Sequence, residues 1–131
     1  MIRQSGDTTA RRPNGAFHLF VYGTLRPGPD DGGPLDGAER VRAATVRGTL
    51  YDAGDYPALI LAGQTPVEGE IWRCPLDLLD VLDSYEAVRE GLFRRVALTV
   101  DGTACWAYVA GPLLGPRLTM DRRIDGGRWE P

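Results

Sequence analysis

Apolar and polar positions along the chain predict a protein built mostly of β-strands. The continuous apolar run 17–22 indicates a buried first strand. Apolar and partly alternating runs predict further strands at 43–51, 58–61, 67–74, 92–100 and 104–111. Asp101 and Gly102 separate the last two runs and are typical of a two-residue hairpin turn. Gly48 lies inside the second run, where a glycine marks a candidate β-bulge.

One segment has the spacing of a helix rather than of a strand. Leucines recur at helical intervals over residues 75–86, and Pro75 suits a first helical turn. We therefore expect a helix over 75–86 and an irregular segment after Pro112, which Trp129 can hold in place. Five to six strands with one main helix and long loops predict an α+β fold, a small mixed β-barrel.

Length and composition predict a single folded unit. The 131 residues are 43% hydrophobic and 25% charged, which is typical of one globular domain with one core. Residues 1–15 are polar and without period, so we expect a flexible tail there and a single domain over 16–131. No apolar run reaches the length of a membrane span and no signal-peptide pattern opens the sequence, so we expect a cytoplasmic protein with no membrane partner.

The charged and metal-binding residues exclude several kinds of chemistry. All 15 basic residues are arginines, which excludes a Walker-type phosphate loop and Schiff-base catalysis, since both need lysine. The formal net charge is -3 and no basic stripe is present, so we expect no nucleic-acid partner. His18 is the only histidine, and Cys74 and Cys105 are expected to be reduced, buried thiols. We therefore expect no metal, and chemistry based on carboxylates, hydroxyls and backbone amides.

One carboxylate on the predicted helix faces an unusual direction. The helix carries four acids, namely Asp77, Asp80, Asp83 and Glu86. At about 100° per residue the aspartates lie toward the polar side, whereas Glu86 lies about 80° from Leu78, toward the apolar face. A carboxylate there is either paired, or used in a cleft with a raised pKa. Two interpretations stay open: an ion pair with Arg94 or Arg95 (or a helix that frays before residue 86), and a functional carboxylate.

The first predicted strand ends in the sequence Tyr22-Gly23-Thr24-Leu25. By itself this motif fits a plain strand-ending turn. A glycine at a strand end can also turn backbone amides toward a bound group, because no Cβ stands in the way.

Several segments taken together resemble a known family. They are FVYGTLRPG, VRGTLYDAGDYPAL, VEGEIW, LDSYE, FRRVALTV and WAYV. Their order and spacing between Phe17 and Tyr108 resemble the γ-glutamylcyclotransferase superfamily. The similarity is to its γ-glutamylamine cyclotransferase-like branch and also to the γ-glutamyl cyclotransferase of butirosin biosynthesis. The chain departs from that pattern at Ala87, where the family often has glycine, and in its acidic, glycine-rich loop 26–40.

The resemblance implies a function and a set of site residues. Such enzymes close the γ-glutamyl group of a γ-glutamyl amine or amino acid to 5-oxoproline and release the amine, with neither metal nor organic cofactor. The resemblance places the catalytic general acid/base on Glu86 and the substrate-binding loop on Tyr22, Gly23, Thr24 and Leu25. Independently of the resemblance, Tyr108 is a further substrate-binding candidate, and Tyr56 and Tyr85 are additional pocket candidates. For all three, a packing role with a solvated hydroxyl is the alternative.

Two other functional classes stay open. The same fold can serve as a non-catalytic binding module for a small ligand, or as an interaction domain that uses an exposed sheet edge. An interaction domain is expected to lack a closed cavity between Gly23 and Glu86. Our preferred expectation is a cytoplasmic bacterial enzyme that acts on a small γ-glutamyl substrate as a monomer or weak dimer.

Overall fold

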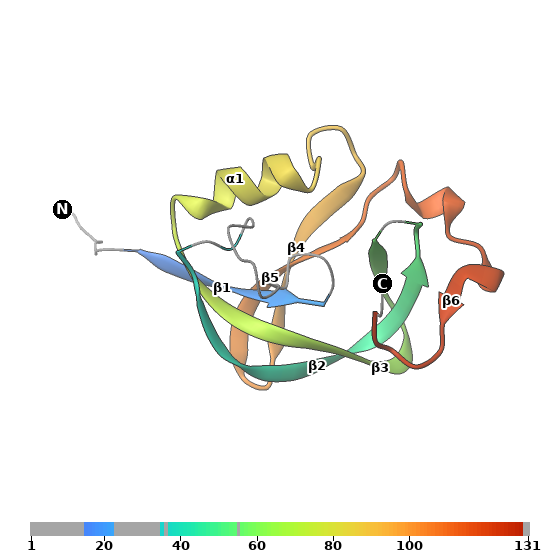
Figure 1. Cartoon of the computed structure of the whole chain (residues 1–131), viewed down its shortest axis with the longest axis horizontal. Coiled ribbons are helices and arrows are strands. Elements are labelled where there is room, and N and C mark those ends of the chain that lie inside the picture. Colours follow the sequence, from blue (N-terminus) through green and yellow to red (C-terminus); the bar gives the residue numbers. More distant parts are fainter. Residues whose placement is uncertain (1–14, 23–34, 36, 55, 130–131) are drawn as a thin grey trace.

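The fold is a six-stranded mixed sheet that curls into an open half barrel, with one main helix across it (Figure 1). The computed structural model describes residues 15–22, 35, 37–54 and 56–129. Its elements are β1 Ala16–Val21, β2 Glu39–Asp52, β3 Pro57–Pro75, α1 Leu78–Tyr85, β4 Phe93–Val100, β5 Thr103–Ala110 and β6 Arg123–Ile124. The strand order is β4-β5-β1-β3-β2-β6. The predicted fold class is confirmed.

Strand β1 lies in the middle of the sheet and is buried on both faces. It pairs antiparallel with β3 and parallel with β5, where Leu19 lies opposite Trp106. Leu19 belongs to a core cluster with Leu82 of α1, whereas Phe20 belongs to a second cluster with Leu50 of β2. Because a core cluster covers each face of β1, its sequence is a continuous apolar run rather than an alternating one.

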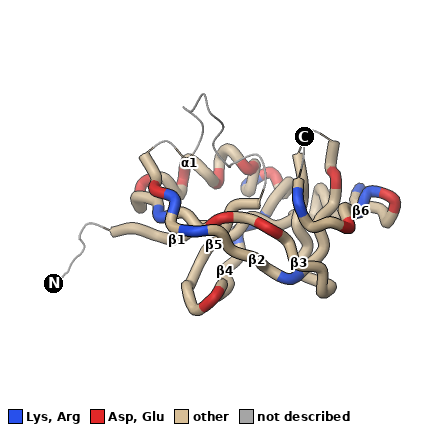
Figure 2. The backbone as a smooth tube through the Cα atoms, turned by 60° about the horizontal axis from the view of Figure 1, so that its bottom comes forward, with Lys and Arg blue, Asp and Glu red and all other residues tan. Residues whose placement is uncertain are grey.

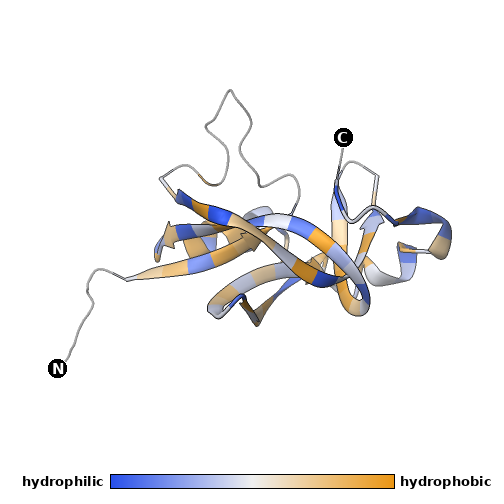
Figure 3. Cartoon of the chain, turned by 90° about the horizontal axis from the view of Figure 1, so that it is seen from below, coloured by the Kyte–Doolittle hydropathy of each residue, from blue (hydrophilic) through white to orange (hydrophobic). Residues whose placement is uncertain are grey.

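Strands β2 and β3 form a long antiparallel ribbon along which apolar and polar positions alternate (Figure 3). The sequence predicted two strands, 58–61 and 67–74, but β3 is continuous. The register shifts where Gly48 faces Thr65 and Thr49 faces Ile60, so residues 61–64 form the extra length of a bulge. Gly63 within it has φ +101°. The irregularity predicted at Gly48 is confirmed as a register shift, but the extra residues lie in β3 rather than in β2, and they account for the interruption in the apolar pattern of β3.

Helix α1 is shorter than predicted. Pro75 does not open the helix but ends β3, where it lies opposite Ala16 of β1. A strand end tolerates proline because no ladder partner is required for the missing N–H. The helix begins at Leu78, and its fully buried residue is Leu82. Glu86 follows as the C-cap residue.

The hairpin between β4 and β5 forms as predicted, whereas the segment after Pro112 is more regular than predicted. Asp101 and Gly102 have φ of +49° and +82°, as a two-residue hairpin turn between β4 and β5 requires. After β5 come two short 3₁₀ turns, Gly115–Arg117 and Met120–Arg122, and then β6, which pairs with β2. Trp129 packs against the cluster that contains Leu50 and holds this final segment on the sheet.

Among the described residues, the charged ones do not gather into a patch of one sign, and both cysteines lie inside the protein. Acidic and basic positions are interspersed along the trace (Figure 2). Cys74 and Cys105 are free and buried. In the described part of the chain, no helix has the length and apolar character that crossing a bilayer demands. The tail predicted over 1–15 lies outside the described residues except for Gly15.

Candidate active site

A pocket of about 150 Å³ lies where the end of β1, the start of β3 and the C-terminal end of α1 meet β4 and β5. Its lining residues are Phe20, Val21, Tyr22, Tyr56, Pro57, Tyr85, Glu86, Leu92, Phe93 and Tyr108. Among these described side chains Glu86 is the only carboxylate, and none is basic. The pocket is thus an aromatic and apolar hollow with a single acid in its wall.

The end of helix α1 sets the position of Glu86. Its N–H donates to the Leu82 carbonyl oxygen at 2.9 Å, which keeps it on the last helical turn. The chain then reverses through Ala87, with φ +53°, so that the Val88 N–H donates to the Asp83 carbonyl oxygen at 3.0 Å. This is a Schellman-type helix end. Since Leu82 is buried beneath it, Glu86 is directed toward the pocket rather than into solvent.

The Glu86 carboxylate is half-buried. No hydrogen bond or ion pair joins it to any of the described residues. The ion pair that the sequence left open is made elsewhere, since Arg95 Nε lies 2.9 Å from Asp83 Oδ1, and Arg94 is exposed. Burial raises the pKa of Glu86 from 4.5 to about 7. A group with that pKa can accept a proton and return it near neutral pH.

Tyr22 joins three strands beneath the pocket. Its hydroxyl donates to the Tyr108 carbonyl oxygen on β5 at 2.6 Å and accepts the Leu59 N–H of β3 at 3.1 Å. Burial, and to a smaller extent the charge of Glu86, raise the pKa of Tyr22, so it stays protonated. The ring of Tyr22 forms part of the pocket wall, while its hydroxyl bonds to backbone groups of β3 and β5.

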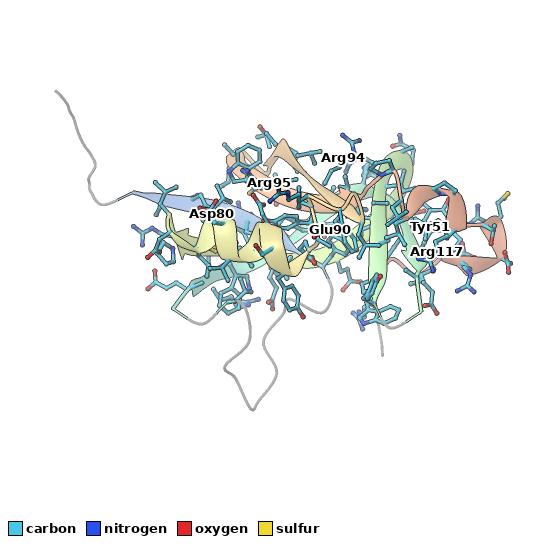
Figure 4. The ribbon with its side chains drawn as sticks, turned by 90° about the horizontal axis from the view of Figure 1, so that it is seen from above. Tyr51, Asp80, Glu90, Arg94, Arg95 and Arg117 are labelled. Carbon is cyan, nitrogen blue, oxygen red and sulfur yellow. The ribbon has the colours of Figure 1, made fainter. Side chains whose placement is uncertain are left out.

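A polar network that the sequence did not reveal lies next to Glu86. The Tyr108 hydroxyl donates to Asp83 Oδ1 at 2.7 Å, and Asp83 also accepts Arg95 Nε. The Arg95 guanidinium lies 4.3 Å from the ring centre of Trp106 on β5. Figure 4 shows Arg95 beside helix α1. Asp83 was expected on the polar side of the helix, but it anchors α1 to β4 and β5.

Aromatic side chains form the rest of the wall. The rings of Tyr56 and Phe93 lie 5.7 Å apart in a tilted arrangement. Tyr85 also lines the pocket and is 53% exposed, which places it at the boundary with solvent. The two tyrosines proposed from the sequence as additional pocket candidates therefore both line it.

The structure brings together three of the six predicted site residues. Glu86, Tyr22 and Tyr108 line one pocket. Gly23, Thr24 and Leu25 lie outside the described residues, as does most of the loop 26–40. Within the described ranges, no three His, Cys, Asp or Glu side chains gather into a group that could hold a metal ion.

Comparison with protein families finds one match over most of the chain. The model of the family described as "Gamma-glutamyl cyclotransferase, AIG2-like" matches residues 19–131. The gamma-L-glutamyl-butirosin B gamma-glutamyl cyclotransferase of Niallia circulans is 35% identical over 103 residues. That alignment covers 70% of this chain and 65% of the relative, so the chain spans slightly less than two thirds of the relative's length.

Two solved structures support the same relationship. Protein ytfP from Escherichia coli is 28% identical, with a TM-score of 0.67, and the match covers 86% of this chain and 96% of that one. An AIG2-like protein from Mus musculus is 26% identical, with a TM-score of 0.63, and the match covers 88% of this chain and 96% of that one. The half-barrel sheet and single main helix described above are thus shared with these proteins.

Proposed function

The chain belongs to the gamma-glutamyl cyclotransferase, AIG2-like family, and from that premise we propose that it is an amine-releasing γ-glutamyl cyclotransferase. Its proposed substrate is a γ-glutamyl amine or γ-glutamyl amino acid, and its products are 5-oxoproline and the free amine. Glu86 is the proposed general acid/base. The observation that carries the proposal is a half-buried carboxylate in the wall of an aromatic pocket, with no pairing partner among the described residues.

The reaction needs a proton carrier but no nucleophile from the protein. An α-amino group has a pKa near 7.7–8.0, so the substrate's amine is mostly an ammonium at neutral pH. Glu86 takes one proton from it, and the freed nitrogen lone pair attacks the γ-amide carbon. The new C–N bond closes the five-membered ring while the bond to the leaving nitrogen breaks. Glu86 gives this proton to the leaving nitrogen as its bond to carbon breaks, and then takes the second proton that the ring nitrogen must lose to become the lactam N–H. That second proton passes to the released amine, which departs as an ammonium ion and leaves Glu86 as a carboxylate.

The pocket favours this proton transfer in two ways. A Glu86 pKa of about 7 lies close to that of the amine, so little free energy separates the two protonation states. The narrow aromatic walls also hold the flexible γ-glutamyl chain folded, with the amine against its own carbonyl group. Such proximity contributes about 7–11 kcal/mol in well-oriented intramolecular reactions.

The segment Tyr22 to Leu25, most of which lies outside the described residues, is the remaining part of the proposal. We assign its backbone amides to the α-carboxylate of the substrate or to the oxyanion that develops on the γ-carbonyl. Tyr108 is assigned to substrate binding. The protein is further proposed to act in the cytoplasm as a monomer or weak dimer, with residues 16–131 as one domain and without a nucleic-acid partner.

The alternative is a binding module that holds a similar ligand without turnover. A protein that only binds a ligand has no need of a proton carrier. Burying the Glu86 carboxylate without a partner among the described residues costs desolvation free energy, which a purely binding role does not explain. An interaction domain that acts through its sheet edge is disfavoured by the pocket that contains both Tyr22 and Glu86.

The test is a panel of γ-glutamyl amines and γ-glutamyl amino acids, with 5-oxoproline and free amine quantified together. We expect equimolar release of the two products from at least one substrate class, and no release by the Glu86→Gln variant. Binding of panel members without release by the folded wild-type protein would support the binding module instead.

A further inference from the structure

The Tyr108 hydroxyl has a fixed donor direction. Asp83, held in an ion pair with Arg95, is a carboxylate and offers only acceptor oxygens. The 2.7 Å contact between the two residues therefore uses the single hydroxyl hydrogen of Tyr108. Burial and the contact with Asp83 raise the pKa of Tyr108, so the hydroxyl keeps that hydrogen throughout the neutral range.

A hydroxyl whose hydrogen is committed can only accept further hydrogen bonds. Tyr108 lines the pocket, and the charge of Glu86 acts on its hydroxyl, so the two groups lie near one another. The remaining lone pairs of the hydroxyl oxygen suit an N–H donor beside Glu86. They are unsuited to a carbonyl or carboxylate oxygen of the substrate, which has no hydrogen to donate.

We propose that Tyr108 is the hydrogen-bond acceptor for the substrate's α-amino group, and that Asp83 is a positioning residue that keeps the Tyr108 hydroxyl in its accepting orientation. This inference rests on the proposed function. The ammonium group then lies between the Glu86 carboxylate, which takes its proton, and Tyr108, which accepts a second N–H. The attacking nitrogen is thereby oriented before it loses its proton.

Tyr22 cannot take this role in the same way. Its hydroxyl donates to the Tyr108 carbonyl oxygen and accepts the Leu59 N–H, so both its hydrogen and one of its lone pairs are used by the fold. Among the described residues, the Tyr108 hydroxyl bonds only to Asp83, through its hydrogen, so its lone pairs are not used by these residues.

The experiment compares two ligands that differ in one group. Calorimetry in the Glu86→Gln background measures the Kd of a γ-glutamyl amide and of the matching glutaryl amide, which lacks the α-amino group. We expect Tyr108→Phe to weaken the γ-glutamyl amide about tenfold and to leave the glutaryl amide unchanged. Tyr56→Phe removes a hydroxyl from the same pocket and is expected to leave the ratio of the two Kd values unchanged.

The Asp83→Asn variant tests the positioning role. An asparagine amide can donate, so the Tyr108 hydrogen is free to turn toward the pocket, and the preference for the amine is expected to fall about as far as in Tyr108→Phe. The Asp83→Asn/Tyr108→Phe double variant is expected to show no further loss. Asp80→Asn, an exposed change on the same helix, serves as the control and is expected to keep the preference of the parent.

Each outcome has a distinct meaning. Equal loss of both ligands in Tyr108→Phe, or additive losses in the double variant, would overturn this inference and leave the cyclotransferase proposal intact. Absence of 5-oxoproline release by the wild-type protein on the whole panel would instead contradict the proposed function. Tyr108→Phe decides the inference even if Asp83→Asn fails to fold, which thermal denaturation would reveal.

Discussion

Glu86 is the residue at which folding and the proposed chemistry oppose each other most directly. Its carboxylate is half-buried at the end of α1, and no described residue pairs with it. A buried carboxylate of this kind is less stable charged than neutral, which is why its pKa rises. The same rise suits it to exchange a proton with an amine at neutral pH.

Glu86→Gln is expected to change stability in a pH-dependent way. Because burial raises the pKa of Glu86 to about 7, the folded state binds the proton more tightly than the unfolded state. The stability that this carboxyl group contributes is fully present below about pH 4.5, falls as the pH rises to about 7 and stays lost above it. The neutral glutamine removes that loss, so the variant is expected to be more stable than wild type by up to about 3 kcal/mol at pH 8.

Urea denaturation of both proteins at pH 5 and pH 8 measures this difference. The gain from Glu86→Gln is expected to be small at pH 5 and to grow toward pH 8. A constant difference at the two pH values would mean that Glu86 has an ordinary pKa in the folded protein.

At the scale of single residues, the sequence predicts which way a side chain faces better than it predicts which residues the side chain contacts. The helical period alone directed Glu86 toward the apolar side, and the structure has it lining the pocket. The same period directed Asp83 outward, yet Asp83 binds Tyr108 and Arg95. Those partners come from strands β4 and β5, and a one-helix projection holds no information about which strand packs alongside.

At the scale of elements, helix α1 is followed by a residue whose backbone conformation favours glycine. Ala87 has φ +53°, a left-handed conformation in which a Cβ costs about 1–2 kcal/mol. Glycine is favoured at this position of a Schellman-type end. The helix end that orients Glu86 is therefore formed even though the backbone of Ala87 is strained.

Ala87→Gly is expected to stabilise the protein by about 0.5–1 kcal/mol. Relief of the left-handed strain exceeds the entropy that glycine adds to the unfolded chain, which is about 0.4–1 kcal/mol. Ala97→Gly on β4 is the matched control and is expected to destabilise, because Ala97 lies in a strand without positive φ. The urea midpoints of the two variants give the comparison, and a lower midpoint for Ala87→Gly would contradict this account of the helix end.

Element boundaries set by adjacent residues were predictable, whereas those set by pairing with a distant strand were not. The hairpin at Asp101 and Gly102 was predictable because the turn is determined by two adjacent residues. The continuity of β3 was not, because its bulge is supported by pairing with β2 across Gly48. Pro75 fits a strand end as well as a helix start, and its pairing with Ala16 decides between them.

At the scale of the whole molecule, one arginine helps to close the curled sheet. Arg42 of β2 reaches the β4–β5 hairpin, where it donates to the Thr103 hydroxyl at 3.0 Å and to the Val100 carbonyl oxygen at 3.4 Å. It also lies 3.4 Å from Asp101 Oδ2. These contacts join strands that are not neighbours in the sheet order.

Arg42→Ala is expected to lower the free energy of unfolding by about 1 kcal/mol, since hydrogen bonds and a partly exposed ion pair are lost together. Arg94→Ala removes an exposed arginine of β4 and is expected to stay within about 0.5 kcal/mol of wild type. Chemical denaturation of the three proteins measures the difference. Equal stability of the two variants would show that Arg42 does not contribute to closure.

The overall architecture was predictable as a class but not as a topology. Strand number, one helix and the loop lengths indicated a small mixed barrel, and the sheet is a mixed half barrel. The order of strands depends on the parallel pairing of β1 with β5 at Leu19 and Trp106. That pairing joins segments far apart in the chain, and neither strand has a local pattern that specifies its partner.

The role of Glu86 is tested by the rate of 5-oxoproline release by wild type and Glu86→Gln, measured side by side between about pH 5.5 and pH 9. We predict that the wild-type kcat/KM falls as the pH drops below about 7, because the Glu86 carboxylate becomes protonated, and that the folded variant releases none at any pH. Release by Glu86→Gln at the wild-type rate would contradict the role assigned to this residue.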